Sequence, residues 1–253
     1  IEALCPMASM ADVEETSVAW DALSTLWDGD LLPLTYQNSV AALKAFVGKQ
    51  GGAVCTSSNA AQLFRWAFSQ KGHVLFLPDE HLGTNTALDM GIRPEQVAVW
   101  NPFQPADPQT LAAARVVVWR GFCHVHTHFT VGDVRAARSR YPGCTIVVHP
   151  ECPRPVVVEA DRYGSTTGII RVVEQAPAGA TIVVGTECHL VERLNNEHPD
   201  KLVVPLAASA CNTMAMTRLP HVLNVLEHIV AGDVVNVVSV EPETAQWARR
   251  ALE

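Results

Sequence analysis

Short apolar runs alternate with helix-favouring stretches along most of this chain. The runs have the length and β-branched content of buried strands, and they cover residues 31–35, 74–77, 116–119, 144–148 and 181–184. Helix-favouring stretches lie between them at 13–26, 40–47, 60–68, 130–140 and 169–174. Because strands that alternate with helices pair in parallel, the sequence predicts an α/β fold with helices on both faces of parallel sheets.

A cysteine opens each round of this alternation. Cys5, Cys123 and Cys211 head segments of 118, 88 and 43 residues, so the third segment is much the shortest. It holds a predicted helix that ends near residue 230, a turn, and a predicted strand at 234–240. The second half of the repeat is therefore missing from the third segment.

These segments predict three αβα sandwich domains related by pseudo-threefold symmetry. Their bounds are 1–120, 121–206 and 207–253. We expect the third unit to be completed by a segment upstream of Ile1, which makes one domain incomplete in this sequence. The alternative is that strands and helices alternate here without internal symmetry, as they do in other α/β proteins.

Composition narrows the class of protein. The chain carries a formal net charge of −8, and its pI is about 5.7. It has no basic cluster and no apolar run of about 20 residues, so we expect neither nucleic acid nor a membrane as a partner. Seven cysteines without a signal-peptide pattern predict a reducing, cytoplasmic location in which thiols stay free for metal binding or catalysis.

Three cysteines that head equivalent units would meet near the pseudo-threefold axis. Zinc would usually take a fourth protein ligand or water there, whereas a 4Fe–4S cluster on three thiolates would keep one iron open as a Lewis acid. The sequence has no Cys-x-x-Cys run that would distinguish these metals. Cys144 and Cys188 are predicted to be packing residues, while Cys55 and Cys152 lie beside polar motifs and remain competing ligands.

Polar side chains stand two residues apart after two of the predicted strands. Tyr36 and Asn38 follow one strand, and His149 and Glu151 follow another. Side chains two residues apart on an extended chain point the same way, and ligands bind at such strand ends. His149 and Glu151 are therefore the candidate acid–base pair, with a strand-capping histidine as the alternative. Tyr36 is a candidate proton donor, and Asn38 a candidate carboxylate ligand.

Two further groups of side chains suggest binding chemistry. The hydroxyl groups of Ser57 and Thr166 precede predicted helices, whose N-termini favour carboxylate or phosphate. His124, His126 and His128 alternate in one loop and suggest the zinc site of a hydrolase. We favour a solvated or supporting role for these histidines, since metal sites rarely take three imidazoles from one short loop.

Nine motifs follow one another along nearly the whole chain. They are Cys5-Pro-Met-Ala, Thr35-Tyr-Gln-Asn38, Cys55-Thr-Ser-Ser-Asn-Ala60, Leu75-Phe-Leu-Pro-Asp79 with Leu82-Gly83, Gly121-Phe-Cys-His-Val-His126, His149-Pro-Glu-Cys152, Gly164-Ser-Thr166, Gly185-Thr-Glu187 and Cys211-Asn-Thr-Met214. Together they resemble the quinolinate synthase family, the quinolinate synthetase A proteins. The resemblance implies the same three pseudo-threefold αβα domains.

The resemblance also implies an activity. Quinolinate synthases condense iminoaspartate with dihydroxyacetone phosphate to quinolinate, phosphate and water in de novo NAD biosynthesis. They are cytoplasmic transferases that depend on an iron–sulfur cluster. L-aspartate oxidase or aspartate dehydrogenase would supply the iminoaspartate upstream.

Site residues carry over from the resemblance by position. Cys5, Cys123 and Cys211 would hold the 4Fe–4S cluster, whereas Cys55 and Cys152 would not be ligands. The substrate pocket would be lined by Tyr36, Asn38, Ser57, His149, Glu151 and Thr166. Among these, Glu151 and His149 would move protons, Tyr36 would assist as an acid, base or gate, and Ser57 and Thr166 would hold anionic groups.

The sequence also departs from the family pattern. Family members carry an N-terminal half-domain with a His-x-Tyr motif and a serine that contact the substrate, and nothing in this sequence matches it. Thr127 stands where the family often has an acidic residue, and Met214 stands where some members have a second cysteine. A non-catalytic α/β binding module and an inactive fragment of the synthase are the alternative interpretations.

Overall fold

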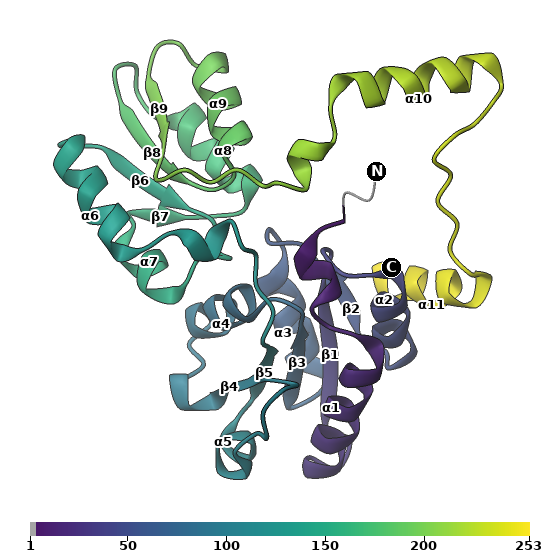
Figure 1. The fold of residues 1–253 in the computed structure, drawn as a ribbon. Coiled ribbons are helices and arrows are strands. Elements are labelled where there is room, and N and C mark those ends of the chain that lie inside the picture. The colour runs from purple at the N-terminus through teal and green to yellow at the C-terminus, as the bar shows by residue number, and fades with distance from the viewer. Residues whose placement is uncertain (1–3) are drawn as a thin grey trace.

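The computed structural model describes residues 4–253, whose strands form two parallel sheets with helices packed on both faces (Figure 1). The first sheet has the order β2 (Ala53–Cys55), β1 (Leu31–Tyr36), β3 (His73–Leu77), β5 (Val116–Trp119) and β4 (Val97–Trp100). The second has the order β7 (Arg162–Tyr163), β6 (Thr145–Val148), β8 (Thr181–Gly185) and β9 (Leu202–Pro205). The prediction of an α/β fold with parallel sheets is confirmed.

Helices connect these strands along the chain. They are α1 (Val13–Leu26), α2 (Ala41–Lys49), α3 (Ala60–Gln70), α4 (Glu80–Asp89), α5 (Pro108–Ala113), α6 (Val131–Arg140), α7 (Arg154–Glu159), α8 (Thr166–Gln175), α9 (Cys188–Glu197), α10 (Leu219–Ala231) and α11 (Pro242–Leu252). Short 3-10 helices cover Pro6–Ser9, Pro94–Gln96, His126–His128 and Met214–Met216. No helix within residues 4–253 has both the length and the apolar character needed to cross a membrane.

The two sheets repeat one topology. In each sheet the first strand of the unit is flanked by the second and the third, which gives β2-β1-β3 in one sheet and β7-β6-β8 in the other. The next strand beside the third is β5 in the first unit and β9 in the second, and each is followed a few residues later by Cys123 or Cys211. The first unit is longer because β4 and α5 are inserted before β5.

Both faces of each sheet are apolar, as parallel sheets require. In the first sheet Leu34, Phe76 and Val118 pack on one face against α3 and α4. Residues of the opposite parity, such as Leu75 and Val117, pack on the other face against α1, α2 and α11. Fully burying an aliphatic or aromatic side chain of this kind contributes roughly 1.5–3 kcal/mol.

Polar residues at the strand ends start the following helices. Asp79 accepts a hydrogen bond from the backbone N–H of Leu82 at 2.7 Å and caps α4. Ser165 caps α8 in the same way, and Glu187 caps α9. A side-chain oxygen at this position satisfies an N–H group that the helix leaves unpaired. Each of these three capping residues therefore follows a strand, starts a helix and leaves a polar side chain at one edge of its sheet.

One predicted element is wrong. The prediction of a strand at 234–240 fails, because these residues run as irregular chain with no neighbouring strand to pair with. The side chain of Val238 is 89% exposed, and α10 has no buried residue. Figure 1 shows α10 apart from both sheets. The third unit is therefore not formed as a sheet within residues 4–253.

The chain returns to the first unit at its end. Helix α11 packs against α2, and the approach is so close that a Cβ atom on Gly48 would lie 2.1 Å from the carbonyl oxygen of Trp247. Only glycine permits this contact. The C-terminal end of the segment between Cys211 and α11 is thus held against the first unit.

Candidate functional site

A cavity of about 720 Å³ lies where the carboxyl ends of the strands of both units meet. Ligands of α/β proteins bind at such strand ends. Its lining residues are Cys5, Tyr36, Gln37, Asn38, Cys123, Val125, His126, His149, Glu151, Thr166, Thr186, Glu187, His189, Leu190, Arg193, Cys211, Thr213, Met214 and Thr217. The cavity therefore joins residues from the first unit, the second unit and the start of the third.

Cys5, Cys123 and Cys211 all line this cavity, and none is in a disulfide. Burial raises the pKa of Cys5, with a further rise from the charges of Glu151 and Cys211. Burial, together with the carboxylate of Glu151, raises the pKa of Cys123 to about 12. Without a cation nearby these two thiols keep their protons, and a bound metal would favour the thiolates instead.

The chemistry of this donor set fits an iron–sulfur cluster. Three free thiols on one cavity wall match a 4Fe–4S cluster that keeps one iron open. A second group also has the composition of a metal site, since ligand atoms of Cys123, His126 and Glu151 lie within 4.8 Å of one another. Both donor sets share Cys123, so the two kinds of site would exclude each other.

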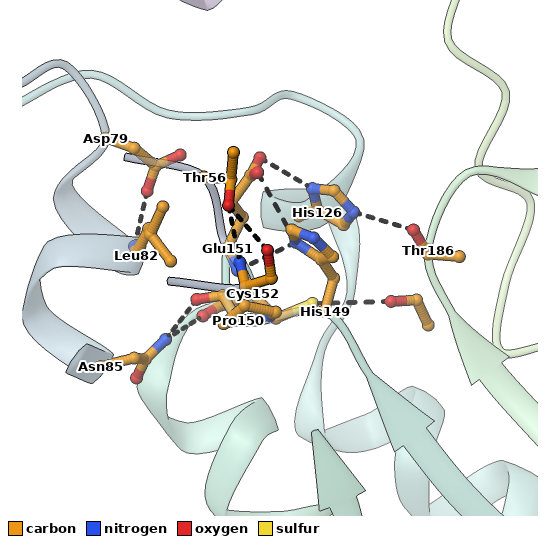
Figure 2. A network of polar contacts seen from close by, with 12 residues as sticks. Thr56, Asp79, Leu82, Asn85, His126, His149, Pro150, Glu151, Cys152 and Thr186 are labelled. Carbon is orange, nitrogen blue, oxygen red and sulfur yellow. Dashed lines mark hydrogen bonds and ion pairs between the residues drawn. The ribbon is translucent and has the colours of Figure 1, made fainter. Parts of the chain in front are cut away.

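Glu151 is the centre of a buried polar network (Figure 2). Its Oε2 atom lies 3.1 Å from Nδ1 of His126, and its Oε1 atom lies 3.6 Å from Nδ1 of His149. The two imidazole rings stack with their centroids 4.4 Å apart. Nε2 of His126 lies 3.1 Å from the hydroxyl of Thr186. The prediction that His149 and Glu151 lie next to each other is confirmed.

The geometry assigns protonation states to this network. Burial is the main cause that lowers the pKa of His149 to about 3, and the neighbouring His126 lowers it further. Nδ1 of His149 accepts the backbone N–H of Glu151 at 3.3 Å, so a neutral ring carries its proton on Nε2. Burial is the largest influence on Glu151 and opposes its ionisation, but the hydrogen bond from His126 and the other polar contacts of the network together outweigh it and lower the pKa of Glu151 to about 2.

Tyr36 lies at the end of β1 and is buried in the cavity wall. Burial raises the pKa of its phenol well above the ordinary value, and the Glu151 carboxylate raises it further. The phenol therefore keeps its proton at neutral pH and is a hydrogen-bond donor. Ser57 interacts with Tyr36 but is not among the lining residues, whereas Asn38 and Thr166 are.

His126 meets one half of the expectation for the histidine loop. It is not solvated, because it is buried and lines the cavity, but it bonds Glu151 and so has the supporting role that the sequence favours. His124 and His128 are exposed. The available sequence signal was the position of His126 three residues after Cys123, since ligand atoms of these two side chains lie within 4.8 Å of each other.

The other cysteines lie outside the cavity wall. Cys55 and Cys152 are fully buried in the apolar cores of the first and second units, which removes them as competing ligands at this cavity. Cys144 packs against the second core, as predicted. Cys188 instead lies 3.5 Å from a carboxylate oxygen of Glu187.

Glu187 supports the third cysteine, Cys211. The sequence did not predict this role of Glu187. Its Oε1 atom accepts the backbone N–H of Cys211 at 3.2 Å, and Oε2 accepts that of His189 at 2.8 Å. Burial opposes ionisation of Glu187, yet these bonds leave its pKa below the ordinary value. An ionised Glu187 thus fixes the backbone of Cys211. Arg193 contributes a permanent positive charge to the same wall.

Comparison with known proteins identifies relatives along the whole chain. A family profile described as Quinolinate synthetase A protein (NadA) matches residues 1–253. A protein named Quinolinate synthase from Nocardioides sp. (strain ATCC BAA-499 / JS614) is 48% identical over 98% of this chain and 66% of its own length.

Proteins of the same name from Bacillus mycoides (strain KBAB4) and Lysinibacillus sphaericus (strain C3-41) are each 46% identical over 98% of this chain. The match covers 68% and 69% of their respective lengths, so the chain spans about two thirds of the relatives that it matches. The profile covers every residue of the sequence, and the relatives carry one name. The chain belongs to the quinolinate synthetase A protein family.

Proposed function

We propose that this chain forms the catalytic part of a quinolinate synthase, which condenses iminoaspartate with dihydroxyacetone phosphate to quinolinate, phosphate and water. The observation that carries the proposal is the cavity whose wall combines Cys5, Cys123 and Cys211 with Tyr36, His149 and Glu151. Family membership supports the same reaction. A cytoplasmic location and a supply of iminoaspartate by L-aspartate oxidase or aspartate dehydrogenase belong to this proposal.

The cluster would be held by Cys5, Cys123 and Cys211. When bound, a 4Fe–4S cluster on three thiolates supplies an open iron as a Lewis acid for a hydroxyl or carboxylate of the substrate. Binding of the cluster would release protons from Cys5 and Cys123, because burial raises the pKa values of both thiols. Glu187 holds the backbone of Cys211 in place for this role.

Proton transfer falls to the network around Glu151. The ionised carboxylate accepts a proton from carbon during enolisation and ring closure, and His126 keeps it oriented. Neutral His149 offers an Nε2–H donor to a substrate oxygen. Tyr36 keeps its phenolic proton at neutral pH and donates it to a developing negative charge.

The substrates are anionic, and several groups are suited to bind them. Thr166 begins α8 on the cavity wall, where the helix dipole favours phosphate or carboxylate. Asn38 contributes an amide from the end of β1. Ser57 lies close enough to Tyr36 to influence the pKa of the phenol, and it would reach an anionic group from beside it. These assignments rest on position in the cavity and on the resemblance of the motifs.

We also propose the domain arrangement 1–120, 121–206 and 207–253, with the third unit completed by a further segment of the polypeptide. Two supporting observations are the repeated sheet topology and the exposed apolar side chains of α10. The greater length of the relatives is consistent with such a segment.

A mononuclear zinc site is the second candidate. Cys123, His126 and Glu151 offer sulfur, nitrogen and oxygen ligands within 4.8 Å, which suits the catalytic zinc of a hydrolase. Zinc at this site would occupy the Glu151 carboxylate and remove it as a base. Metal analysis of the intact protein distinguishes the two candidates.

The test is anaerobic purification of the intact protein with three variants. We expect about four irons and four sulfides per chain in the native protein, loss of both in Cys123→Ala, and retention of both in the control Cys144→Ala. Glu151→Gln should keep the visible absorption of the cluster while kcat falls by at least about 100-fold. Stoichiometric zinc in place of iron would reject the proposal, and loss of the cluster in Glu151→Gln would make that residue structural.

A further inference from the structure

The backbone around Glu151 is held by a residue from the other unit. Asn85 lies in α4 of the first unit, and its side chain is buried. Its Nδ2 atom donates to the carbonyl oxygen of Pro150 at 2.8 Å and to that of Cys152 at 2.9 Å. Figure 2 shows both bonds, which reach the residues immediately before and after Glu151.

The amide of Asn85 has one orientation that suits this site. Its Oδ1 atom is buried and has no hydrogen-bond partner within residues 4–253. If the amide flipped, Oδ1 would face the carbonyl oxygens of Pro150 and Cys152, and acceptor would meet acceptor. Both donations therefore fix the amide, and the amide in turn fixes the peptide group that precedes Glu151 and the one that follows Cys152.

The helix that carries Asn85 is itself well anchored. Asp79 caps its first turn, and Gly83 lies directly on Phe76 and Val118 of the sheet. At the far end Asp89 pairs with Arg154 at 2.7 Å and bonds the hydroxyl of Tyr163, so α4 spans the seam between the units. Asn85 is therefore attached to a rigid support.

We propose that Asn85 is a positioning residue that holds the Glu151 carboxylate against His126 by clamping the carbonyl groups on both sides of it. This inference rests on the proposed role of Glu151 in proton transfer. The clamp couples the loop at 149–152 of the second unit to α4 of the first, so correct docking of the units and alignment of the base occur together. A misplacement of about 1 Å at a reacting group can cost about 100-fold in rate.

Asp89→Asn is a matched control for the clamp. It weakens the same seam at the outer end of α4, but Asp89 contacts Arg154 and Tyr163 and has no bond to residues 149–152. A purely structural role for α4 would make both variants behave alike. A clamp on Glu151 would make Asn85 alone affect catalysis.

The experiment compares Asn85→Ala, Asn85→Ser and Asp89→Asn in the cluster-loaded intact protein. We expect kcat to fall about 10-fold to 100-fold in Asn85→Ala with KM changed less than about three-fold, an intermediate loss in Asn85→Ser, and native kcat in Asp89→Asn. In the Glu151→Gln background, Asn85→Ala should cause no further loss, because both changes act on one carboxylate. Equal losses in Asn85→Ala and Asp89→Asn, or a full further loss in the Glu151→Gln background, would overturn the proposal.

Hydrogen exchange tests the clamp without any activity. The backbone amides of Glu151 and Cys152 bond to His149 and should exchange faster in Asn85→Ala, but not in Asp89→Asn. If the protein proved not to be a quinolinate synthase, this result would still support the clamp. Unchanged exchange at both amides in Asn85→Ala would reject it, whatever the enzyme's activity.

Discussion

At the scale of single residues, burial at the cavity changes the protonation states of the side chains that line it. His149 is 3% exposed, and its imidazole is neutral because the folded protein disfavours the charged ring. Glu151, in contact with it, is ionised because the polar contacts around it, the hydrogen bond from His126 foremost, together outweigh the opposing effect of burial. A neutral His149 and an ionised Glu151 therefore lie side by side at the end of β6.

This burial predicts a pH dependence of stability. The pKa of His149 is about 3 in the folded protein and 6.5 ordinarily, so between these values the unfolded chain binds a proton that the folded chain does not. Stability is therefore full above pH 6.5 and falls as the pH drops towards 3. Between pH 7 and pH 5 we expect the native protein to lose about 1–2 kcal/mol more than His149→Gln.

Urea unfolding at the two pH values measures this difference. The window excludes Glu151, whose ordinary pKa of 4.5 and folded value of about 2 place its contribution below pH 5. The raised pKa of Asp79 affects both proteins equally and cancels in the comparison. Parallel losses in the native protein and in His149→Gln would show that the imidazole is not desolvated.

The sequence allowed some of these residues to be predicted. Tyr36, Asn38, His149 and Glu151 follow strands at a spacing of two residues, and that local pattern places all four on the cavity wall. The burial of His126 was not predictable, because its partners, Glu151 and Thr186, meet it only through the fold. Local spacing contains no information about such contacts.

At the scale of elements, α4 depends on a glycine at its contact with the sheet. A Cβ atom at Gly83 would lie 2.6 Å from both Phe76 Cδ1 and Val118 Cγ1. Alanine improves the intrinsic stability of a helix by about 0.5–1 kcal/mol, but overpacking a rigid core costs about 1–3 kcal/mol. We therefore expect Gly83→Ala to lower the free energy of unfolding by about 1–2 kcal/mol.

Gly168→Ala in α8 is the control, and denaturant unfolding measures both variants. A Cβ atom there would come no closer than 3.7 Å to the Ser165 hydroxyl, so only the gain in helix propensity should remain. A stabilised Gly83→Ala would mean that α4 can move away from the sheet.

Elements were predictable where local sequence and fold agree. The predicted strands at 31–35, 74–77, 116–119, 144–148 and 181–184 each lie within one residue of a strand in the structure at either end. The run at 234–240 has the same valine-rich composition and forms no strand, since a strand needs a neighbour to pair with. Composition indicates a preference for extended structure, but a strand forms only where a neighbouring strand is available.

At the scale of the whole molecule, the cysteine spacing predicted a repeat, and two sheets with the repeated strand order are present within residues 4–253. Both complete units have one strand order, with β4 and α5 as the difference in length. The exposed apolar residues of α10 include Leu219, Leu223, Leu226, Ile229 and Val230. A face of this kind in a folded protein marks a contact with another segment or chain.

Hydrogen exchange tests whether a further segment covers this face. In a chain of residues 1–253 we expect amides of α10 and of residues 234–240 to exchange rapidly, and in the intact protein to be at least about 100-fold slower. Amides of α11, which already packs on α2, should be protected in both and are the internal control. Equal exchange of α10 in the two proteins would contradict completion of the third unit.

The return of α11 to α2 also fixes where the segment after Cys211 ends. Cys211 is tied to Glu187 at one end of the segment, and α11 is seated on Gly48 at the other. The intervening residues 212–241 are therefore anchored at each end, and loss of either contact would leave one end of the segment free.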